Sequence, residues 1–467
     1  MPVADGNTLE PATAVLNSAS SSSGGAYGGT LFFSGGSIGM AADTYRSNYG
    51  VVVEPDITIK MQRDQWRVAG RLDRGMGQRD IRLDLAFTDY VHREIEGDGS
   101  VGTTFKSKGG DLRLQARHAD VGPLRGVWGL QLEDADFSAL GEEAFVPQTR
   151  TRLAAAFALE ELTWAGGTTS AGLRLEQARV SSDGDADPAD SRFGAATQRD
   201  FTLNSASVSH VIPWRTNWRL SASLSASQRA PTYFELFANG VHAATGVYER
   251  GDPAMDKEQG HHLELAAVWK VTDSHLRVGV FQTRFSRFIG LNNAGRVVDD
   301  TGQEVPAGTD GALPLYRFES VRARLHGVEI DGAKRLLDST WRLDATARLD
   351  LTRGINLDRA EPLPRLPGWR VALGLHASTG PWRAGMELTQ VGRQARVPEG
   401  DSATAGYTLV NLSLVRQFNL GSADAMAFAK LGNATDKLAY NASAIQTIRG
   451  LSPVAGRALQ FGMRVAF

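Results

Sequence analysis

The sequence contains no cysteine, which excludes disulfide scaffolds, zinc–thiolate sites, iron–sulfur clusters and thiol nucleophiles. It also lacks an excess of basic charge, because 50 lysines and arginines face 52 aspartates and glutamates, for a net charge of −2. This balance argues against a nucleic-acid partner, which a basic patch or stripe would usually signal. Long apolar runs are missing as well. The longest, Leu153–Leu159, is far shorter than the ~20 residues of a membrane-spanning helix.

Apolar and polar residues alternate along much of the chain, and this period of two predicts β-strands. Trp341–Thr352 places six apolar side chains on one face and six polar or charged ones on the other. Ile81–Thr88 and the C-terminal Leu459–Phe467 follow the same pattern. Several such segments run to about ten residues, the length that a tilted strand needs to cross a bilayer. A mean hydropathy of −0.24 agrees with a membrane barrel, since a polar interior dilutes the apolar signal.

Short joints and long polar segments separate these strands in a regular way. Ser378–Pro381, Pro213–Thr216 and Asp338–Thr340 are short, whereas the long segments are Ser181–Thr197, Arg229–Glu258, Asn292–Leu313 and Asp436–Ala455. Short turns at one end and long loops at the other are typical of outer-membrane barrels, with the turns in the periplasm and the loops outside. Most tryptophans lie near the short joints, which favours an interfacial aromatic girdle, although tryptophans also pack where strands begin. They are Trp66, Trp128, Trp164, Trp214, Trp218, Trp269, Trp341 and Trp382.

We therefore expect an all-β protein, a transmembrane antiparallel β-barrel with about 19 strands between Gly28 and Phe467. An odd number does not suit a single-chain bacterial barrel, and about three more strands would reach the 22-stranded receptor class. The count predicts that the start of the barrel is missing from this chain. Residues 1–27 read as a linker or the remnant of an early strand or loop, because Asn17–Gly25 is rich in serine and glycine. No basic segment followed by an apolar one marks a signal peptide.

From about Asn17 to Phe467 the chain resembles the TonB-dependent outer-membrane receptors, and several stretches are similar to the branch associated with zinc uptake. A closing strand, GRALQFGMRVAF, ends on an aromatic residue and resembles the signal read by barrel-assembly machinery. Val51–Asp56 stands where that branch often has a histidine-rich insertion, and Tyr440–Ala442 stands where Tyr-Arg-His is frequent. The stretches that carry the likeness are Tyr45–Gly50, Asp89–Phe105, Asp136–Thr149 and Ser227–Glu258.

The resemblance implies energised uptake of a metal ion or metal chelate across the outer membrane, with zinc favoured and a ferric siderophore or haem left open. In that family a plug fills the barrel and an inner-membrane TonB complex pulls on an N-terminal box, and neither element is recognisable here. The implied surroundings are outer-membrane lipid and lipopolysaccharide. No resident cofactor is expected, only a transported zinc or iron chelate.

Histidine and carboxylates are the metal ligands that remain without cysteine, and the chain has nine histidines. His242 lies in the longest loop with Glu235, Glu249 and Asp252, and we expect the metal, if one binds there, at His242 and Glu249. The alternative for each of these candidate residues is that it is an ordinary polar loop residue that contacts only water and lipopolysaccharide sugars. Further candidate ligand residues in predicted outer loops are His92, Glu94, Glu96, Glu142 and Glu143.

Catalytic motifs are not recognisable in a supporting context, so an enzyme is the weaker class. A rim hydrolase would need serine, histidine and acidic residues at one rim, and their spacing here selects no set. The rivals to an uptake receptor are a passive porin-like or structural barrel and a non-functional truncated receptor. A porin predicts constitutive conductance without a tightly bound ligand, whereas a receptor predicts saturable binding.

Overall fold

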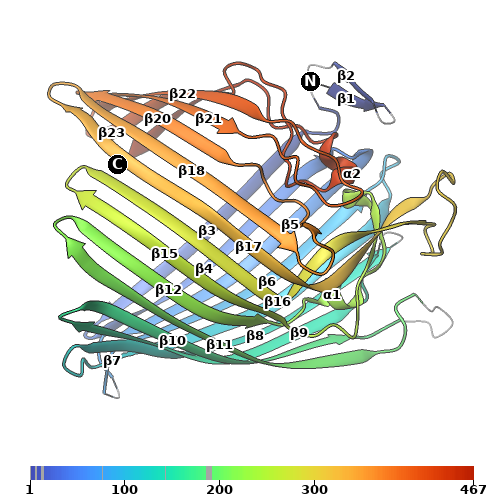
Figure 1. Ribbon diagram of the computed structural model, residues 1–467, viewed down its shortest axis with the longest axis horizontal. Coiled ribbons are helices and arrows are strands. Elements are labelled where there is room, and N and C mark those ends of the chain that lie inside the picture. The colour runs from blue at the N-terminus through green and yellow to red at the C-terminus, as the bar shows by residue number, and fades with distance from the viewer. Residues whose placement is uncertain are drawn as a thin grey trace.

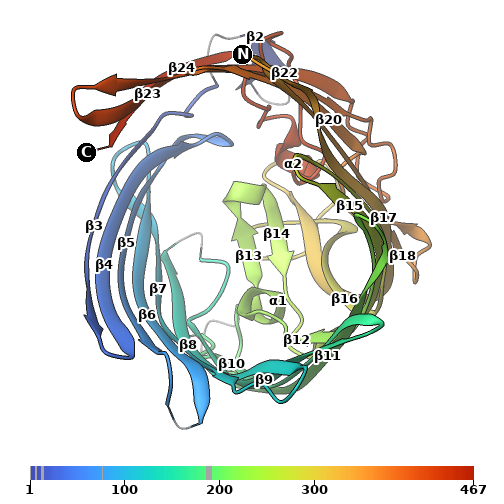
Figure 2. The same ribbon diagram turned by 90° about the vertical axis from the view of Figure 1, so that its left-hand side faces the viewer.

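The computed structural model describes residues 2–5, 8–11, 15–75, 77–141, 144–185 and 192–466. Its strands follow one another round a closed barrel, shown from the side in Figure 1 and along its axis in Figure 2. Nearly all neighbours pair antiparallel, which confirms the all-β barrel that the period of two predicts. Neither α1 (Tyr233–Phe237) nor α2 (Gln446–Arg449), nor any other helix in the described part of the chain, has the length and apolarity to cross a membrane.

The strands of the wall are β3 (Ser20–Phe33), β4 (Gly36–Val51), β5 (Glu54–Leu72), β6 (Gln78–Ile95), β7 (Val101–His118), β8 (Leu124–Gly141), β9 (Thr149–Trp164), β10 (Gly167–Ser182), β11 (Thr197–Arg215), β12 (Trp218–Arg229), β15 (Glu258–Val271), β16 (Ser274–Val298), β17 (Leu313–Asp338), β18 (Arg342–Asn356), β20 (Arg370–Thr379), β21 (Trp382–Val391), β22 (Tyr407–Leu420), β23 (Ala423–Gly432) and β24 (Ala458–Ala466). A separate two-stranded sheet consists of β1 (Pro2–Asp5) and β2 (Thr8–Pro11).

The strand count agrees with the sequence. Among the described residues the barrel order passes through 22 strands, but β13 (Asn239–His242), β14 (Val247–Arg250) and β19 (Glu361–Pro362) are only two to four residues long. The wall closes past them, since β12 pairs directly with β15 and β18 with β20. Nineteen long strands remain, as predicted. Whether further strands precede residue 1 stays a prediction.

Two strand boundaries differ from those expected. The first wall strand begins at Ser20 rather than Gly28, so Ser20–Gly25 belongs to an early barrel strand, the second of the two alternatives expected for residues 1–27, and not to a linker. Serine and glycine have low strand propensity, but the backbone of β4 pairs with all of β3, from Ser20 opposite Tyr49 to Phe33 opposite Gly36. β16 continues to Val298 inside the loop expected over Asn292–Leu313, because it pairs with β17 beyond the rest of the wall.

The two ends of the barrel differ. In Figure 1 short turns gather at the left-hand end, while long loops and both helices lie at the right-hand end. Seven of the eight tryptophans named above lie next to the short turns, as a girdle requires. Trp66 is the exception, because it lies inside β5, opposite Ala42 and Phe87. We refer to the long-loop end as the outer mouth.

The outward face of the wall is apolar and the lumen is polar. On β24, Leu459, Phe461 and Met463 expose 61%, 71% and 62% of their surface, which only contact with lipid would cover. The alternate positions of neighbouring strands carry charges that pair with one another across the lumenal face, for example Arg277 with Glu264 and Glu329. The alternation of the sequence therefore separates lipid from water across a single sheet.

The loop between β12 and β15 folds inward at the outer mouth. Figure 2 shows its helix α1 (Tyr233–Phe237) and its hairpin β13–β14 within the ring of wall strands. Leu236 and Val247 are completely buried, in an apolar cluster that also contains Phe201, Leu203 and Phe318 of the wall. The largest core of the described chain thus lies between this loop and the inner wall, and it holds the loop in one position.

Candidate functional site

The inward-folded loop is fixed at its base by Arg229, the last residue of β12. Its guanidinium donates hydrogen bonds to Glu235 at 2.7 and 3.1 Å and to Glu258 at 3.2 Å. Burial by itself lowers the pKa of Arg229, but the bonds to both carboxylates outweigh burial and raise it. Since Glu258 begins β15, Arg229 ties both ends of the loop and its helix together.

Within the hairpin, the structure brings His242 and Glu249 together. Nδ1 of His242 lies 2.8 Å from Oε1 of Glu249, which also accepts a hydrogen bond from Thr245 at 3.1 Å. Phe145 stacks on the imidazole with ring centres 4.3 Å apart, and only 4% of Glu249 is exposed. The pair supplies one nitrogen and one carboxylate ligand of the kind that zinc takes. Its role in metal binding stays a prediction.

The other two carboxylates expected in this loop have local partners. Glu235 accepts a hydrogen bond from the backbone N–H of Thr232 at 2.7 Å, as in a capping box, in addition to its ion pair with Arg229. Asp252 accepts one from the backbone N–H of Ala254 at 2.9 Å. Both contacts stabilise the fold of the loop, and neither involves His242.

His92 lies on the lumenal face of β6, apart from the hairpin. Its Nδ1 is 2.9 Å from the hydroxyl of Tyr90, and Phe105 stacks on its ring at 4.4 Å. Burial lowers the pKa of His92. Glu94 follows two residues later. Burial raises the pKa of Tyr49, and the negative charge of Glu94 raises it further. The backbone N–H of Glu96 closes the turn to Ser100 at 3.0 Å.

Two of the expected ligands, Glu142 and Glu143, lie outside the described residues. Among the residues that the structure describes, no three histidine, aspartate or glutamate side chains come together as a set that could hold a metal ion.

Sequence reasoning missed a cavity of about 600 Å³ at the outer mouth. Three loops and the extended ends of β16 and β17 enclose it, and it is lined by Leu291, Asn292, Asn293, Ala294, Gly295, Tyr316, Arg359, Glu361, Pro364, Arg365, Pro398, Glu399, Gly400, Asp401, Ile445 and Gln446. Because these residues come from five separate segments, no sequence motif predicts the cavity. The only local signal is the density of charged residues in the loops after β18 and β21.

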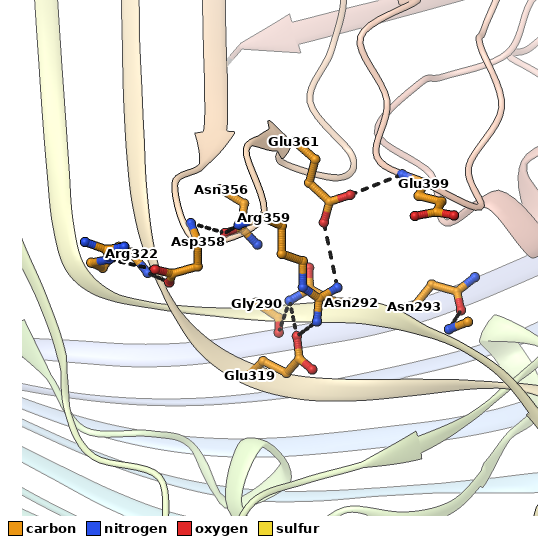
Figure 3. A network of polar contacts seen from close by, with 11 residues as sticks. Gly290, Asn292, Asn293, Glu319, Arg322, Asn356, Asp358, Arg359, Glu361 and Glu399 are labelled. Carbon is orange, nitrogen blue, oxygen red and sulfur yellow. Dashed lines mark hydrogen bonds and ion pairs between the residues drawn. The ribbon is translucent and has the colours of Figure 1, made fainter.

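Figure 3 shows the polar network beside this cavity. Arg359 donates to Glu319 at 2.6 Å and lies 3.7 Å from Glu361, whose other oxygen accepts the backbone N–H of Glu399 at 3.3 Å. Asn292 donates to Glu319 at 3.3 Å from the neighbouring strand. The loops after β18 and β21 are thereby joined to the wall.

The cavity presents donors and acceptors of both charges. Burial raises the pKa of Tyr316, so its phenol stays protonated and can donate a hydrogen bond. Arg365 has no hydrogen-bond or ion-pair partner among the described residues. Arginine, phenol and amide donors on one side and carboxylates on the other suit a polar ligand that is rich in oxygen.

Comparison with known proteins places this geometry in a family. A family model described as "TonB dependent receptor-like, beta-barrel" matches residues 6–432. The structure of the copper transporter OprC superposes with a TM-score of 0.79 at 17% identity, over 97% of this chain and 72% of that chain. The FrpB iron transporter from Neisseria meningitidis gives 0.72 at 12% identity, over 95% and 71% of the two chains.

A third solved structure is the ferric enterobactin receptor PfeA from Pseudomonas aeruginosa, in a mutant form. It gives a TM-score of 0.71 at 14% identity, over 97% of this chain and 71% of that chain. Identities this low show a common fold and nothing finer. The fold and the match over residues 6–432 together lead to one conclusion: the chain belongs to the family of TonB-dependent receptor β-barrels.

Proposed function

We propose that this barrel takes up a metal as an oxygen-rich chelate across the outer membrane, energised by a TonB complex of the inner membrane. Barrels of this family are outer-membrane proteins, and the family consists of receptors and transporters rather than enzymes. The observation that carries the proposal is the cavity at the outer mouth, where Arg365, Tyr316 and Asn293 offer hydrogen-bond donors to an incoming ligand. Related folds include transporters of copper and iron and a ferric siderophore receptor.

The test is a titration of the purified chain with ferric siderophores of different chemical classes, followed by quenching of tryptophan fluorescence. Arg365→Ala removes a charged donor from the cavity, and loss of one such bond lowers affinity about tenfold or more. Arg396→Ala is the matched control, because Arg396 is exposed in a neighbouring loop and does not line the cavity. Equal affinities for the wild type and Arg365→Ala, or conductance without saturable binding, would favour a passive barrel.

Zinc ions are the second candidate substrate, and the contact between His242 and Glu249 favours them. Calorimetric titration with zinc alone separates the two candidates. His242→Ala and Glu249→Ala should each weaken zinc binding, whereas His210→Ala, on the wall strand β11, should leave it unchanged. If zinc binding is absent in the wild type while a ferric chelate binds, the chelate proposal stands alone.

A further inference from the structure

The outward face of β15–β18 carries a ladder of side chains in register. Ala267, Val278, Ile330 and Leu349 face one another across the four strands, and Leu265, Val280, Val328 and Leu351 form the next row toward the outer mouth. Leu265 and Val280 expose 48% and 45% of their surface, as lipid-facing side chains do. These rows belong to the apolar belt of the barrel.

The next two rows change abruptly from apolar to cationic. In the row next to Val328 on the side of the outer mouth, His326 of β17 lies directly opposite Arg353 of β18. In the following row, Arg324 of β17 lies opposite Arg284 of β16. His261 faces Arg284 from β15. Five cationic or ionisable side chains therefore share one outward patch at the level where the apolar belt ends. We call this set the basic rim: His261, Arg284, Arg324, His326 and Arg353.

Within the part of the chain that the structure describes, the arginines of the basic rim have no counter-charge. Most arginines of the lumenal face form ion pairs, but Arg284, Arg324 and Arg353 have no hydrogen-bond or ion-pair partner among the described residues. Nδ1 of His326 is buried and also has no partner. Like charges directly opposite on neighbouring strands repel, so this arrangement weakens the wall unless an anion lies between them.

A cavity of about 560 Å³ joins the basic rim to the apolar belt. It opens on the outward face, with Arg324, His326 and Arg353 at its upper edge. Leu263 lies in the same row as His326, and Leu265, Val280, Val328 and Leu351 lie one row below. The site thus combines an anion-binding edge with an apolar groove that runs toward the bilayer centre. A lipid with a phosphorylated headgroup has the same two parts, in the same order.

We propose that the basic rim binds the phosphorylated headgroup of a glycolipid of the outer leaflet, lipopolysaccharide, with an acyl chain in the groove below. The phosphates lie between Arg284, Arg324 and Arg353, whose planar guanidinium groups suit bidentate contacts with phosphate oxygens. The long-loop end of the strands faces the outer leaflet, where this glycolipid resides. The proposal requires only that the barrel sits in the outer membrane, and it does not depend on the substrate transported.

The test uses the full purified chain in zwitterionic detergent, with binding followed by native mass spectrometry and by the thermal unfolding midpoint. The probes are Kdo2-lipid A, dephosphorylated lipid A, phosphatidylglycerol and inorganic phosphate. The triple variant Arg284→Ala, Arg324→Ala, Arg353→Ala should bind Kdo2-lipid A at least tenfold more weakly. A variant with lysine at the same three positions should keep much of the binding, because the charge remains.

Lys334→Ala is the matched control. Lys334 lies on the same strand and the same outward face, but near the short-turn end, opposite Ala345. The Lys334→Ala variant should bind Kdo2-lipid A with the same affinity as the wild type. If the arginines only stabilised the fold, the triple alanine variant would have a lower unfolding midpoint than the wild type even without lipid. We expect an equal or higher midpoint without lipid, and a lower one only when Kdo2-lipid A is present.

Three results would overturn the proposal. They are unchanged binding of Kdo2-lipid A by the triple alanine variant, equal binding of phosphatidylglycerol by the wild type, and full competition by millimolar inorganic phosphate. Weak binding of dephosphorylated lipid A, together with loss of affinity at high salt, would support the phosphate contact.

Discussion

The guanidinium of Arg449 lies 3.0 Å from the carboxylate of Asp401, and only 8% and 10% of the two side chains are exposed. Arg449 ends the short helix α2 (Gln446–Arg449) and also donates to the carbonyl oxygens of Ser402 at 2.8 Å and Ala444 at 3.1 Å. This buried ion pair fastens the loop after β23 to the loop after β21. Since Asp401 lines the cavity at the outer mouth, the pair also fixes part of the cavity wall.

Arg449→Ala should release both loops, because it leaves the Asp401 carboxylate buried without its counter-charge. Breaking a buried ion pair from one side costs about 3–5 kcal/mol. Hydrogen exchange of the amides in residues 436–455 measures this as lost protection. The double variant Arg449→Ala, Asp401→Ala should lose less protection than Arg449→Ala alone, and an equal or larger loss would contradict the assignment.

Arg229→Ala should free the inward-folded loop, because Arg229 bonds both Glu235 and Glu258. Hydrogen bonds to charged groups contribute about 1.5–3 kcal/mol each, so the loop should open more often and be cut faster by a protease. Limited proteolysis within residues 230–257 measures this. Arg287→Ala is the control, because its partner Asp256 is 54% exposed, whereas the partners of Arg229 are 10% and 17% exposed, and an ion pair with an exposed carboxylate should contribute little. Similar cleavage of both variants would count against a special role for Arg229.

Asn17 and Gly50 should act as one unit. The Asn17 amide donates to the carbonyl oxygens of Val51, Glu54 and Ile57 at 3.1, 2.9 and 2.6 Å, which holds the turn between β4 and β5. A Cβ at Gly50 would lie 1.9 Å from Oδ1 of Asn17 and 2.2 Å from its backbone carbonyl oxygen, so Gly50→Ala must displace both the side chain and the backbone of Asn17.

We therefore expect Gly50→Ala to lower the unfolding midpoint more than Asn17→Ala does, because it also displaces the backbone of Asn17. Adding Asn17→Ala to Gly50→Ala should cause little further loss, since the bonds of the Asn17 side chain are already broken. Gly35→Ala is unsuitable as a control because its φ of 91° is itself strained for alanine, whereas Gly25 has open space around it. Gly25→Ala should leave the midpoint unchanged. Fully additive effects of Asn17→Ala and Gly50→Ala would refute the coupling.

His92 should titrate below its ordinary value of 6.5, since burial lowers its pKa in the folded protein. As the pH falls, His92 is therefore protonated at a higher pH in the unfolded chain than in the folded protein. The stability contributed by neutral His92 is complete above pH 6.5 and is lost as the pH falls from there toward the folded pKa. NMR titration of the imidazole checks the shift. A pKa of His92 at or above 6.5 would contradict the shift. A pKa that does not change in Phe105→Ala, which admits water to the ring, would show that burial is not its cause.

The sequence by itself determined the kind of fold, because alternation is a local property of each strand. Residues such as Leu459, Phe461 and Met463 repeat every second position, and in a single sheet that period alone decides which face meets lipid. The alternation of short joints with long loops likewise set the two ends of the barrel. Ser20–Gly25 escaped this reading because the strand there is specified by its pairing with β4 and not by its own side chains.

Only the tertiary structure decided which distant residues meet. His242 and Glu249 belong to one loop and could be proposed together from the sequence, but the cavity residues Tyr316, Arg365 and Asp401 lie on separate segments that barrel closure brings together. The basic rim depends in the same way on register, because only the pairing of β16, β17 and β18 sets Arg284 against Arg324 and His326 against Arg353. A period of two fixes the face of each strand, whereas register between strands is set by backbone hydrogen bonds over the whole sheet.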